Sequence, residues 1–355
     1  TVRPQGMGFN TGRRNLIING AMQVAQRGTS STSTGYQTTD RFTFNMSNFD
    51  NAAFTQVQST AAPSGFSSSW RIDCTTVETA LAADEYSNFA QPIEAQNLQN
   101  IQNGTSGAKS LTLSFYVKSN KTGTFGVNLY KPDNTGRQIT ATYQVSSADT
   151  WEFKTITFAG DTAGGGIDND NGAGFYIYWH LAAGTNFTSS DSTSWSNYAN
   201  AGFAFGHAVN IFDNTANDWA ITGVQLEVGE NASDFEHRSF GEELVLCQRY
   251  YSQFDDTNGG WIAGGFFYNT TAVEAAVRLP QPMRAAPTVS IGGTESHIVI
   301  QRAATSNAGA GSTVFNQATT VAYNLSTTAD GSSTTGNGTN LRVQNTAILK
   351  HDAEL

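Results

Sequence analysis

The chain has 355 residues, a formal net charge of -10 and a charged-residue content of 14%, well below the roughly 25% of ordinary globular proteins. The acidic balance argues against nucleic-acid binding, which needs clustered Lys and Arg. No apolar run approaches the ~18 residues of a membrane span, and the N-terminus lacks the apolar segment of a signal peptide. We therefore expect no nucleic-acid partner, no membrane insertion and synthesis in the cytoplasm.

The first residues, Thr1–Arg14, carry three arginines and no acidic residue. They predict either an extended arm that docks onto a partner or a frayed, solvated terminus. The next stretch, Asn15–Arg27, has two apolar segments around Asn19-Gly20, a dipeptide that favours a tight turn between strands. This stretch therefore predicts a β-hairpin.

Short strand candidates then recur along the chain, separated by polar turns. They are Arg41–Met46, Ala53–Gln58, Ser69–Cys74, Leu111–Lys118, Phe125–Tyr130, Thr150–Phe158, Gly174–Leu181 and Ala220–Val228. Glu94–Ile101 predicts a short helix, and Gly223 in the last strand predicts a bulge. The pattern is typical of an all-β chain whose N-terminal domain is an antiparallel β-sandwich of the jelly-roll type.

A helix is predicted after the last of these strands. Ser239 and Glu242 have the S-x-x-E spacing of a capping box. Leu244, Cys247 and Tyr251 then recur at helical spacing. Their apolar face could meet symmetry mates at a three-fold axis, or it could pack within the chain between two β domains.

The C-terminal part predicts a second, smaller β domain. Its predicted strands are Trp261–Tyr268, Thr271–Leu279, His297–Gln301, Thr319–Leu325 and a last one within Asn340–Leu355. Polar loops are expected at Ala303–Ser312 and Ser326–Asn340. The proline-rich segment Leu279–Thr288 is expected to be an edge strand or a loop. The expected organisation is an arm over 1–14, a jelly roll over 15–238, a linking helix over 239–253 and a β domain over 254–355. Cys74 and Cys247 are expected to be buried thiols rather than a disulfide.

Ten short segments spread along nearly the whole chain carry a common pattern. They are Asn15–Gly20, Gln26–Gly28, Asp40–Phe42, Gln91–Glu94, Leu111–Ser119, Thr222–Gly229, Phe235–Ser239, Glu243–Tyr251, Met283–Pro287 and Asp352–Leu355. Together they resemble virion proteins of tailed bacteriophages, namely tail fibres and fibre-like structural proteins, often of phages that infect marine bacteria and cyanobacteria. The first module is also similar to carbohydrate-binding modules of the galactose-binding-like jelly-roll type.

The resemblance implies a structural component of a virion. It implies a homotrimeric fibre or appendage, an N-terminal arm that contacts other virion proteins, and a host surface glycan as the ligand. A fibre or decoration protein attached to the capsid is the alternative within this class, and a stand-alone carbohydrate-binding module is the alternative outside it. No catalytic motif comes with the resemblance.

A sugar-binding site needs aromatic faces and polar groups that orient hydroxyls. The strand Gly174–Leu181 carries Phe175, Ile177 and Trp179 on one face and Tyr176, Tyr178 and His180 on the other. One face must be core, and the other could be a binding platform that Trp195 and Tyr198 extend. A second candidate platform is the aromatic group Trp261, Phe266, Phe267 and Tyr268. Packing in a core or between subunits is the alternative for both groups.

The segment 168–172 (DNDNG) is similar to a calcium loop, with Asp168 and Asp170 as ligands. It departs from the EF-hand pattern because its glycine comes one residue early and Trp179 takes the place of the twelfth-position Glu. A solvated turn rich in Asp and Asn is therefore favoured over a structural calcium site. No other cofactor is expected.

Glycoside hydrolysis would need a pair of carboxylates. Four acidic residues could be paired on paper, namely Glu94, Asp161, Glu227 and Glu236. Glu227 is out of phase with the core face of its strand, so we expect it to be exposed. No G-x-S-x-G, H-E-x-x-H or P-loop motif occurs, and short repeating rungs of a tailspike depolymerase are absent. The sequence therefore predicts a binding protein and not an enzyme.

Overall fold

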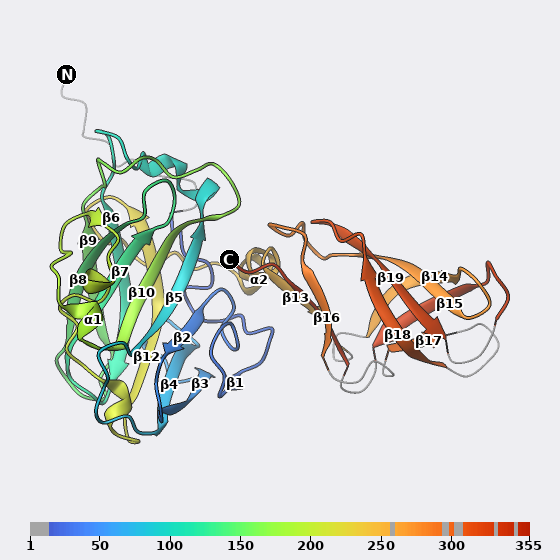
Figure 1. Ribbon diagram of the computed structural model, residues 1–355, viewed down its shortest axis with the longest axis horizontal. Helices are drawn as coiled ribbons and strands as arrows, with labels where there is room; N and C mark the ends of the chain where they lie inside the picture. The colour runs from blue at the N-terminus through green and yellow to red at the C-terminus, as the bar shows by residue number, and fades with distance from the viewer. Residues whose placement is uncertain (1–13, 256–259, 293–297, 302–307, 330–332, 344–346) are drawn as a thin grey trace. The chain divides into compact units, whose positions relative to one another are not determined.

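The computed structural model describes residues 14–255, 260–292, 298–301, 308–329, 333–343 and 347–355. They form two compact units divided between Glu243 and Leu244, with the last residue grouped with the first unit (Figure 1). The first unit is a β-sandwich and the second is built around a β-barrel, so the chain is all-β. The predicted arm lies outside the described residues except for Arg14. Within the described ranges, no helix is long and apolar enough to cross a membrane.

The sandwich consists of two six-stranded sheets in which every strand pair is antiparallel. The first sheet has the order β1 (Ser30–Ser31), β3 (Ala53–Ser59), β4 (Ser69–Thr76), β12 (Asp218–Val228), β6 (Leu111–Ser119), β9 (Glu152–Phe158). The second has the order β11 (Ser196–Asn197), β8 (Arg137–Val145), β7 (Gly123–Lys131), β10 (Ala173–Ala183), β5 (Tyr86–Glu94), β2 (Thr43–Ser47). Of the long strands, β5 and β8 were not predicted from the sequence. The predicted helix over 94–101 is the 3-10 helix η1 (Ala95–Ile101).

The core lies between the two sheets and is rich in aromatic rings. Phe175, Ile177 and Trp179 of β10 are buried there, as period-two alternation predicts. Trp70 stacks on Phe89 with 4.1 Å between ring centroids. Apolar faces of this kind supply most of the free energy that favours folding.

The predicted bulge is present in β12. The pairing of β12 with β6 shifts register between Thr222 and Gln225, and Gly223 between them has φ +62°. A Cβ atom at this glycine would lie 2.7 Å from the Cζ atom of Phe66. A side chain is therefore excluded here both by the backbone conformation and by the neighbouring ring.

The predicted hairpin around Asn19-Gly20 is wrong. Asn19 does turn the chain, with φ 60° and a hydrogen bond from the Met22 amide to its carbonyl oxygen. However, the flanking segments do not pair with each other. The Leu16 amide before the turn donates to the Leu226 carbonyl of β12 at 2.9 Å instead, and the Val224 amide donates to the Gly20 carbonyl at 2.9 Å. Asn19-Gly20 therefore forms a turn as predicted, but its neighbours bond to β12, which lies far along the chain.

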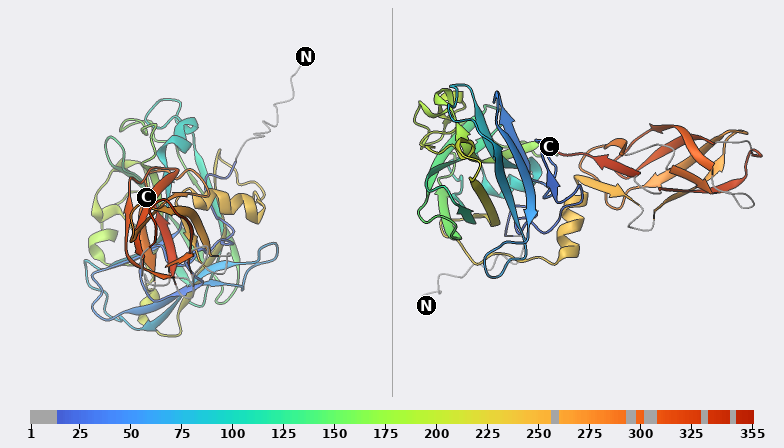
Figure 2. Two further views of the ribbon diagram at one scale, coloured as in Figure 1. Left: turned by 90° about the vertical axis from the view of Figure 1, so that its right-hand side faces the viewer. Right: turned by 90° about the horizontal axis from the view of Figure 1, so that it is seen from below.

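The helix α2 (Phe240–Gln248) starts at the predicted capping box. The Glu242 amide donates to the Ser239 Oγ atom at 3.3 Å, and the Ser239 amide donates to Glu242 Oε2 at 2.9 Å. These reciprocal bonds satisfy two amides at the helix N-terminus that have no partner within the helix. The helix is gold in Figure 2.

The prediction that Tyr251 belongs to the apolar face of this helix is wrong. The helix ends at Gln248, and Tyr251 begins strand β13 (Tyr251–Phe254) instead of continuing the helix. Cys247 and Tyr251 are buried, and Leu244 is half-buried. The exposed apolar side chains of α2 are those of Phe240 and Val245. Cys74 is also buried, and no disulfide joins it to Cys247.

The second unit contains a closed barrel and a three-stranded sheet. The barrel order is β14 (Trp261–Phe267), β15 (Ala272–Arg278), β19 (Ala322–Ala329), β18 (Ala308–Asn316), β17 (Ile298–Gln301), β20 (Gly338–Val343), and the small sheet has the order β13, β21 (Ile348–Asp352), β16 (Thr288–Gly292). The predicted pairing of the first two barrel strands is confirmed. His297 lies outside the described residues.

The polar loops predicted in this unit are partly wrong. Strand β18 occupies part of 303–312, and β19 continues to Ala329. In β19 only Tyr323, Leu325 and Thr327 are buried, and the residues between them are small or polar. A strand with so few large apolar residues has the composition of a loop, although its backbone pairs on both sides.

Candidate functional site

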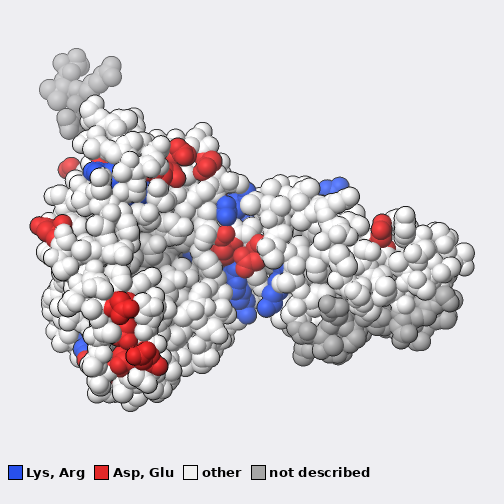
Figure 3. Space-filling model, viewed as in Figure 1, with Lys and Arg blue, Asp and Glu red and all other residues white. Residues whose placement is uncertain are grey.

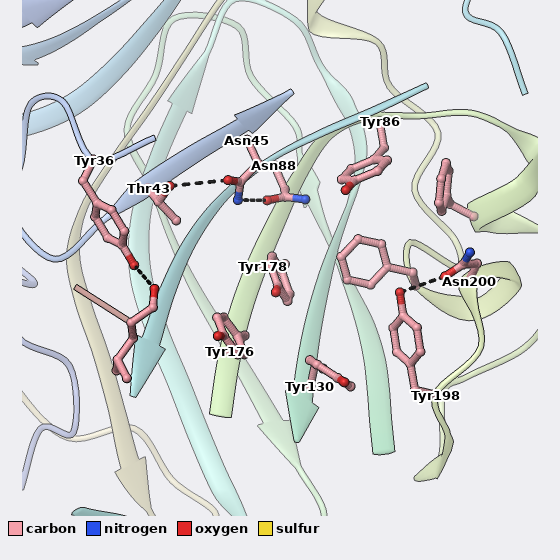
Figure 4. Close-up of a pocket in the computed structure, with 13 residues that line it drawn as sticks. Tyr36, Thr43, Asn45, Tyr86, Asn88, Tyr130, Tyr176, Tyr178, Tyr198 and Asn200 are labelled. Carbon is pink, nitrogen blue, oxygen red and sulfur yellow. Dashed lines mark hydrogen bonds between the residues drawn. The ribbon is translucent and has the colours of Figure 1, made fainter. Parts of the chain in front are cut away.

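A cleft of about 610 Å³ lies on the face of the second sheet that points away from the core (Figure 4). The sandwich lines it with aromatic, amide and hydroxyl side chains. These are Tyr36, Thr43, Asn45, Tyr86, Asn88, Tyr130, Tyr176, Tyr178, Phe187, Tyr198, Asn200 and Phe203. The volume falls within the roughly 300–1,000 Å³ range of ligand sites in proteins.

The floor of the cleft is a row of tyrosine rings across neighbouring strands. Tyr176 and Tyr178 of β10 point outward because they alternate with core residues. Their rings stack with 5.7 Å between centroids and 9° between planes. Tyr130 pairs opposite Tyr176 in the ladder of β7 and β10, with ring centroids 6.1 Å apart. Tyr198 continues the row at 4.8 Å from Tyr130.

One wall of the cleft is a cluster of packed aromatic rings. Helix α1 (Thr185–Thr188) carries Phe187, whose ring meets Tyr86 edge-on at 4.8 Å. Phe203 contacts Tyr178 edge-on at 4.9 Å and Tyr86 at 5.8 Å. Edge-to-face contacts of this kind favour one ring orientation, so the wall is rigid before any ligand arrives.

The opposite side of the cleft carries a chain of polar side chains from β2 and β5. The Thr43 hydroxyl donates to Asn45 Oδ1 at 3.4 Å, and Asn45 Nδ2 donates to Asn88 Oδ1 at 2.9 Å. Asn88 is 1% exposed, and its Nδ2 atom has no hydrogen-bond partner among the described residues. Because a buried amide without a partner is costly, this donor is available to a ligand that reaches the floor of the cleft.

The hydroxyls of Tyr178 and Tyr198 are neutral donors and acceptors. Burial raises the pKa of Tyr178 well above its ordinary value, with a smaller effect from neighbouring tyrosines. Burial likewise raises the pKa of Tyr198, whose hydroxyl donates to Asn200 Oδ1 at 2.9 Å. At neutral pH these groups can therefore hydrogen-bond a hydroxylated ligand without contributing charge.

The structure brings together three of the predicted sugar-platform residues, namely Tyr176, Tyr178 and Tyr198. His180 does not line the cleft. Its side chain is buried between the ring of Phe203, at 4.7 Å, and the ring of His207, at 6.1 Å. Desolvation lowers the pKa of His180 to about 3, so the imidazole is neutral and acts as packing beneath the cleft.

The two predicted tryptophans lie elsewhere. Trp195 stacks on the core residue Phe175 with 6.2 Å between ring centroids, and its Nε1 donates to the Ala159 carbonyl at 2.6 Å. It therefore anchors a loop to the core. Trp261 belongs to the barrel unit, is 54% exposed and has the guanidinium of Arg342 5.8 Å from its ring.

The second predicted platform is only partly exposed. Phe267 is buried in the barrel core, whereas Phe266 and Tyr268 are exposed on its outer side. The alternation in β14 separates the two kinds of residue. The four aromatic residues therefore do not form one surface.

Asp168 and Asp170 lie in a hydrogen-bonded turn. The Gly172 amide donates to Asp170 Oδ1 at 2.8 Å, and Asn134 Nδ2 donates to Asp168 Oδ1 at 3.3 Å. The Asp168 amide in turn donates to Asp133 Oδ2 at 3.0 Å. In the part of the chain that the structure describes, no cluster of three or more acidic, His or Cys side chains is arranged to hold a metal ion.

The four acidic residues considered for catalysis do not line the cleft. Asp161 accepts hydrogen bonds from Arg137 Nε and Nη2 at 2.7 and 2.9 Å. Glu236 accepts from the Asn15 amide at 2.6 Å. Glu94, at the end of β5, is buried and accepts from Gln96.

The expected exposure of Glu227 is wrong. Glu227 is 4% exposed, because the segment after β12 folds back over the outer face of that strand. The amide and hydroxyl of Ser233 in this segment donate to its carboxylate at 2.8 and 2.5 Å. Side-chain parity gives the face of a strand but does not show whether a later segment covers that face.

Most of the cleft was not predicted from the sequence. The missed residues are Tyr36, Thr43, Asn45, Tyr86, Asn88, Tyr130, Phe187, Asn200, Phe203 and Leu355. Tyr130 could have been predicted, because it ends a predicted strand and, by alternation, its side chain lies on the face opposite to that of Leu129. Thr43 and Asn45 lie on β2, within the predicted strand over 41–46, but nothing in the sequence placed that strand beside the site. The others come from unpredicted β5, from short helices, from loops and from the end of the chain, whose position depends on the order of strands in the sheet.

Comparisons with known proteins give remote likenesses. The sequence matches no protein-family model. No curated protein matches it. Among solved structures, the enzymatically active domain of tailspike protein 4 of bacteriophage CBA120 shares 14% identity over 60% of this chain and 21% of that chain, with a TM-score of 0.34. The family 11 carbohydrate-binding module of a cellulosomal cellulase of Clostridium thermocellum shares 11% identity over 58% of this chain and 97% of the module, with a TM-score of 0.30.

A third structure, the N-terminal modules of endo-1,4-β-D-xylanase 10B of Clostridium thermocellum complexed with xylohexaose, shares 10% identity over 60% of this chain and 30% of that one, with a TM-score of 0.30. This chain thus spans about a fifth of the tailspike domain's length. The function of the cleft is inferred below from its own residues.

Proposed function

We propose that the sandwich binds a glycan in the tyrosine-lined cleft, and that the chain serves as a structural component of a phage virion. In this role it is an oligomeric fibre or appendage that adheres to glycans on the host surface. The observation that supports glycan binding is the row of Tyr130, Tyr176 and Tyr178, with Asn88 beside it. The virion role is supported by the sequence resemblance.

The row of rings suits the chemistry of a pyranose. Sugar rings present C–H faces that stack on aromatic rings, and their rims carry hydroxyls that need donors and acceptors. The centroids of successive tyrosines are 4.8–6.1 Å apart. The cleft therefore offers several neighbouring aromatic contacts, which suits a chain of sugars better than a single one.

In this proposal the cleft binds a glycan and does not cleave it. Glycosidases cleave with two carboxyl groups that flank the scissile bond. None of the side chains that line the cleft is acidic. The acidic residues considered above are instead hydrogen-bonded within the fold.

A binding assay with matched variants tests the proposal. Arrays of bacterial surface polysaccharides should retain the wild-type chain, and the double variant Tyr176→Ala/Tyr178→Ala should lose this retention by tenfold or more, since residues that dominate an interface each contribute about 2 kcal/mol or more. The control is Ile177→Val on the same strand, which trims the core at a cost of about 0.5–1.5 kcal/mol in stability and should bind normally. Retention of the double variant at wild-type strength would refute a site in the cleft.

The trimer and the place in the virion belong to the same proposal. Three weak sites on one body would raise avidity without strong single contacts. Light scattering measures the oligomeric state, and tracing the chain in images of purified virions distinguishes a tail fibre from a capsid-attached fibre or decoration protein. Absence from virions would favour a stand-alone carbohydrate-binding module.

A further inference from the structure

The lining of the cleft carries no charged side chain. The lining consists of six tyrosines, three asparagines, two phenylalanines, one threonine and Leu355. In Figure 3 the surface over β5 and β10 is white, and acidic side chains lie toward the ends and along the edges of the sandwich. An anionic ligand would therefore meet no charged side chain in the lining of the cleft.

The two cations on the described strands of this sheet, Lys131 and Arg137, are already engaged. Lys131, which follows Tyr130, is fully buried, and its Nζ donates to the carbonyls of Gly164 and Gly165 at 2.7 and 2.9 Å. Arg137, its partner in the ladder of β7 and β8, holds the buried carboxylate of Asp161 with two hydrogen bonds. Neither side chain can turn to a ligand without leaving a buried group unpaired.

One further cation lies near the edge of the cleft. The guanidinium of Arg27 is 5.6 Å from the ring centroid of Tyr36. Arg27 itself does not line the cleft. Its guanidinium could contact an acidic sugar at the edge of the cleft, so it provides a specific control.

We infer that the cleft selects uncharged glycans and discriminates against sugars that carry a carboxylate, sulfate or phosphate. This inference rests on the proposed function. Binding would remove an anionic group from water without giving it a charged partner, and desolvation of an unpaired ion is costly. The unpaired Asn88 amide offers a single neutral donor, which gives a buried anion no countercharge.

Asn88 is also a specificity-determining residue in this scheme. Its Oδ1 is occupied by Asn45, and Asn45 is in turn held by Thr43. This chain of bonds orients the free Nδ2 atom of Asn88 as a donor. A ligand atom that accepts from it is a sugar hydroxyl or a ring oxygen, and a site built to donate rejects ligands without an acceptor at that place.

The test compares matched neutral and acidic probes. The neutral probes are hexasaccharides of β-1,4-linked glucose, mannose and galactose, and the acidic probes are the same chains with C6 of alternate residues oxidised to carboxylate. By titration calorimetry at low salt, wild type should bind its best neutral probe at least tenfold more tightly than the oxidised counterpart. Binding of no probe of either kind would overturn the proposed function together with this inference. Equal or tighter binding of an oxidised probe would overturn only the inference, and loss of that binding in Arg27→Gln would identify the cation responsible.

A charge-gain variant gives an independent measurement. Asn200 is exposed and lines the cleft, so Asn200→Lys should fold and should narrow the preference for the neutral probe at least threefold. Gln144→Lys adds the same charge on an exposed position of β8 that does not line the cleft, and it should leave the preference unchanged. An equal effect of the two lysines would mean that net charge, and not the lining of the cleft, sets the preference.

Discussion

Three buried histidines should make the chain lose stability as the pH falls below 6.5. Desolvation lowers the pKa of His180 to about 3 and that of His207 to about 4 in the sandwich, and the pKa of His351 to about 4 in the barrel unit. The geometry agrees for His207, whose Nδ1 accepts a hydrogen bond from the Gly126 amide at 3.1 Å and must be unprotonated. All three imidazoles are therefore neutral in the folded chain down to about pH 5.

The sign and size of the effect follow from proton linkage. A histidine in the unfolded chain titrates near 6.5, so below that pH the unfolded state binds more protons than the folded state and stability decreases. Between pH 7 and pH 5 each neutral histidine costs about 2 kcal/mol, at about 1.4 kcal/mol per pH unit per group. The sandwich should lose about 4 kcal/mol through His180 and His207, and the barrel unit about half as much through His351.

Urea denaturation at pH 7, 6 and 5 measures this loss. Trp261 is in the barrel unit and the other five of the six tryptophans are in the sandwich, so tryptophan fluorescence mainly follows the sandwich. Asp73 and Asp133 have pKa values raised by burial, and they change stability in the opposite direction as the pH falls. The double variant His180→Gln/His207→Gln therefore provides the comparison, and it should lose most of the wild-type pH dependence. An unchanged dependence in this variant would refute the reasoning.

Two further substitutions test the packing that positions the cleft. Asp161→Asn leaves the partly buried guanidinium of Arg137 without its buried carboxylate partner and should cost about 3–5 kcal/mol in urea denaturation; a cost below 1 kcal/mol would show that the pair is not needed. Gly20→Ala places a Cβ atom 2.1 Å from the Val224 carbonyl oxygen, and it should destabilise the sandwich by about 1–3 kcal/mol. Gly241→Ala, where a Cβ meets nothing within 4 Å, is the control and should raise the melting temperature slightly, since alanine favours a helix by about 1 kcal/mol over glycine.

The local features of the fold could be predicted because they depend on neighbouring residues. Alternation along 174–181 separated the buried Phe175 and Trp179 from the outward Tyr176 and Tyr178. The spacing of Ser239 and Glu242 gave the start of α2. In each case the physical rule acts within a few residues of the chain.

The assembled cleft could not be predicted, because it depends on which strands become neighbours. Tyr130 meets Tyr176 only through the pairing of β7 with β10, and Asn88 joins them because β5 lies on the other side of β10. Trp195 was expected at the site on its residue type alone, yet a carbonyl of a distant loop fixes its indole. Sequence therefore identified the kind of side chain needed and one strand of the site, but not its walls.

The closure of the barrel limits the ways in which copies of this chain could associate. Each of its six described strands pairs with two neighbours, so this part of the described chain presents no row of unpaired backbone amides and carbonyls to a strand from another copy. Exposed strand edges are what recruits further chains into aggregates. Many copies of the barrel could therefore be displayed close together, as on the surface of a particle, and contacts between them would have to be made by side chains.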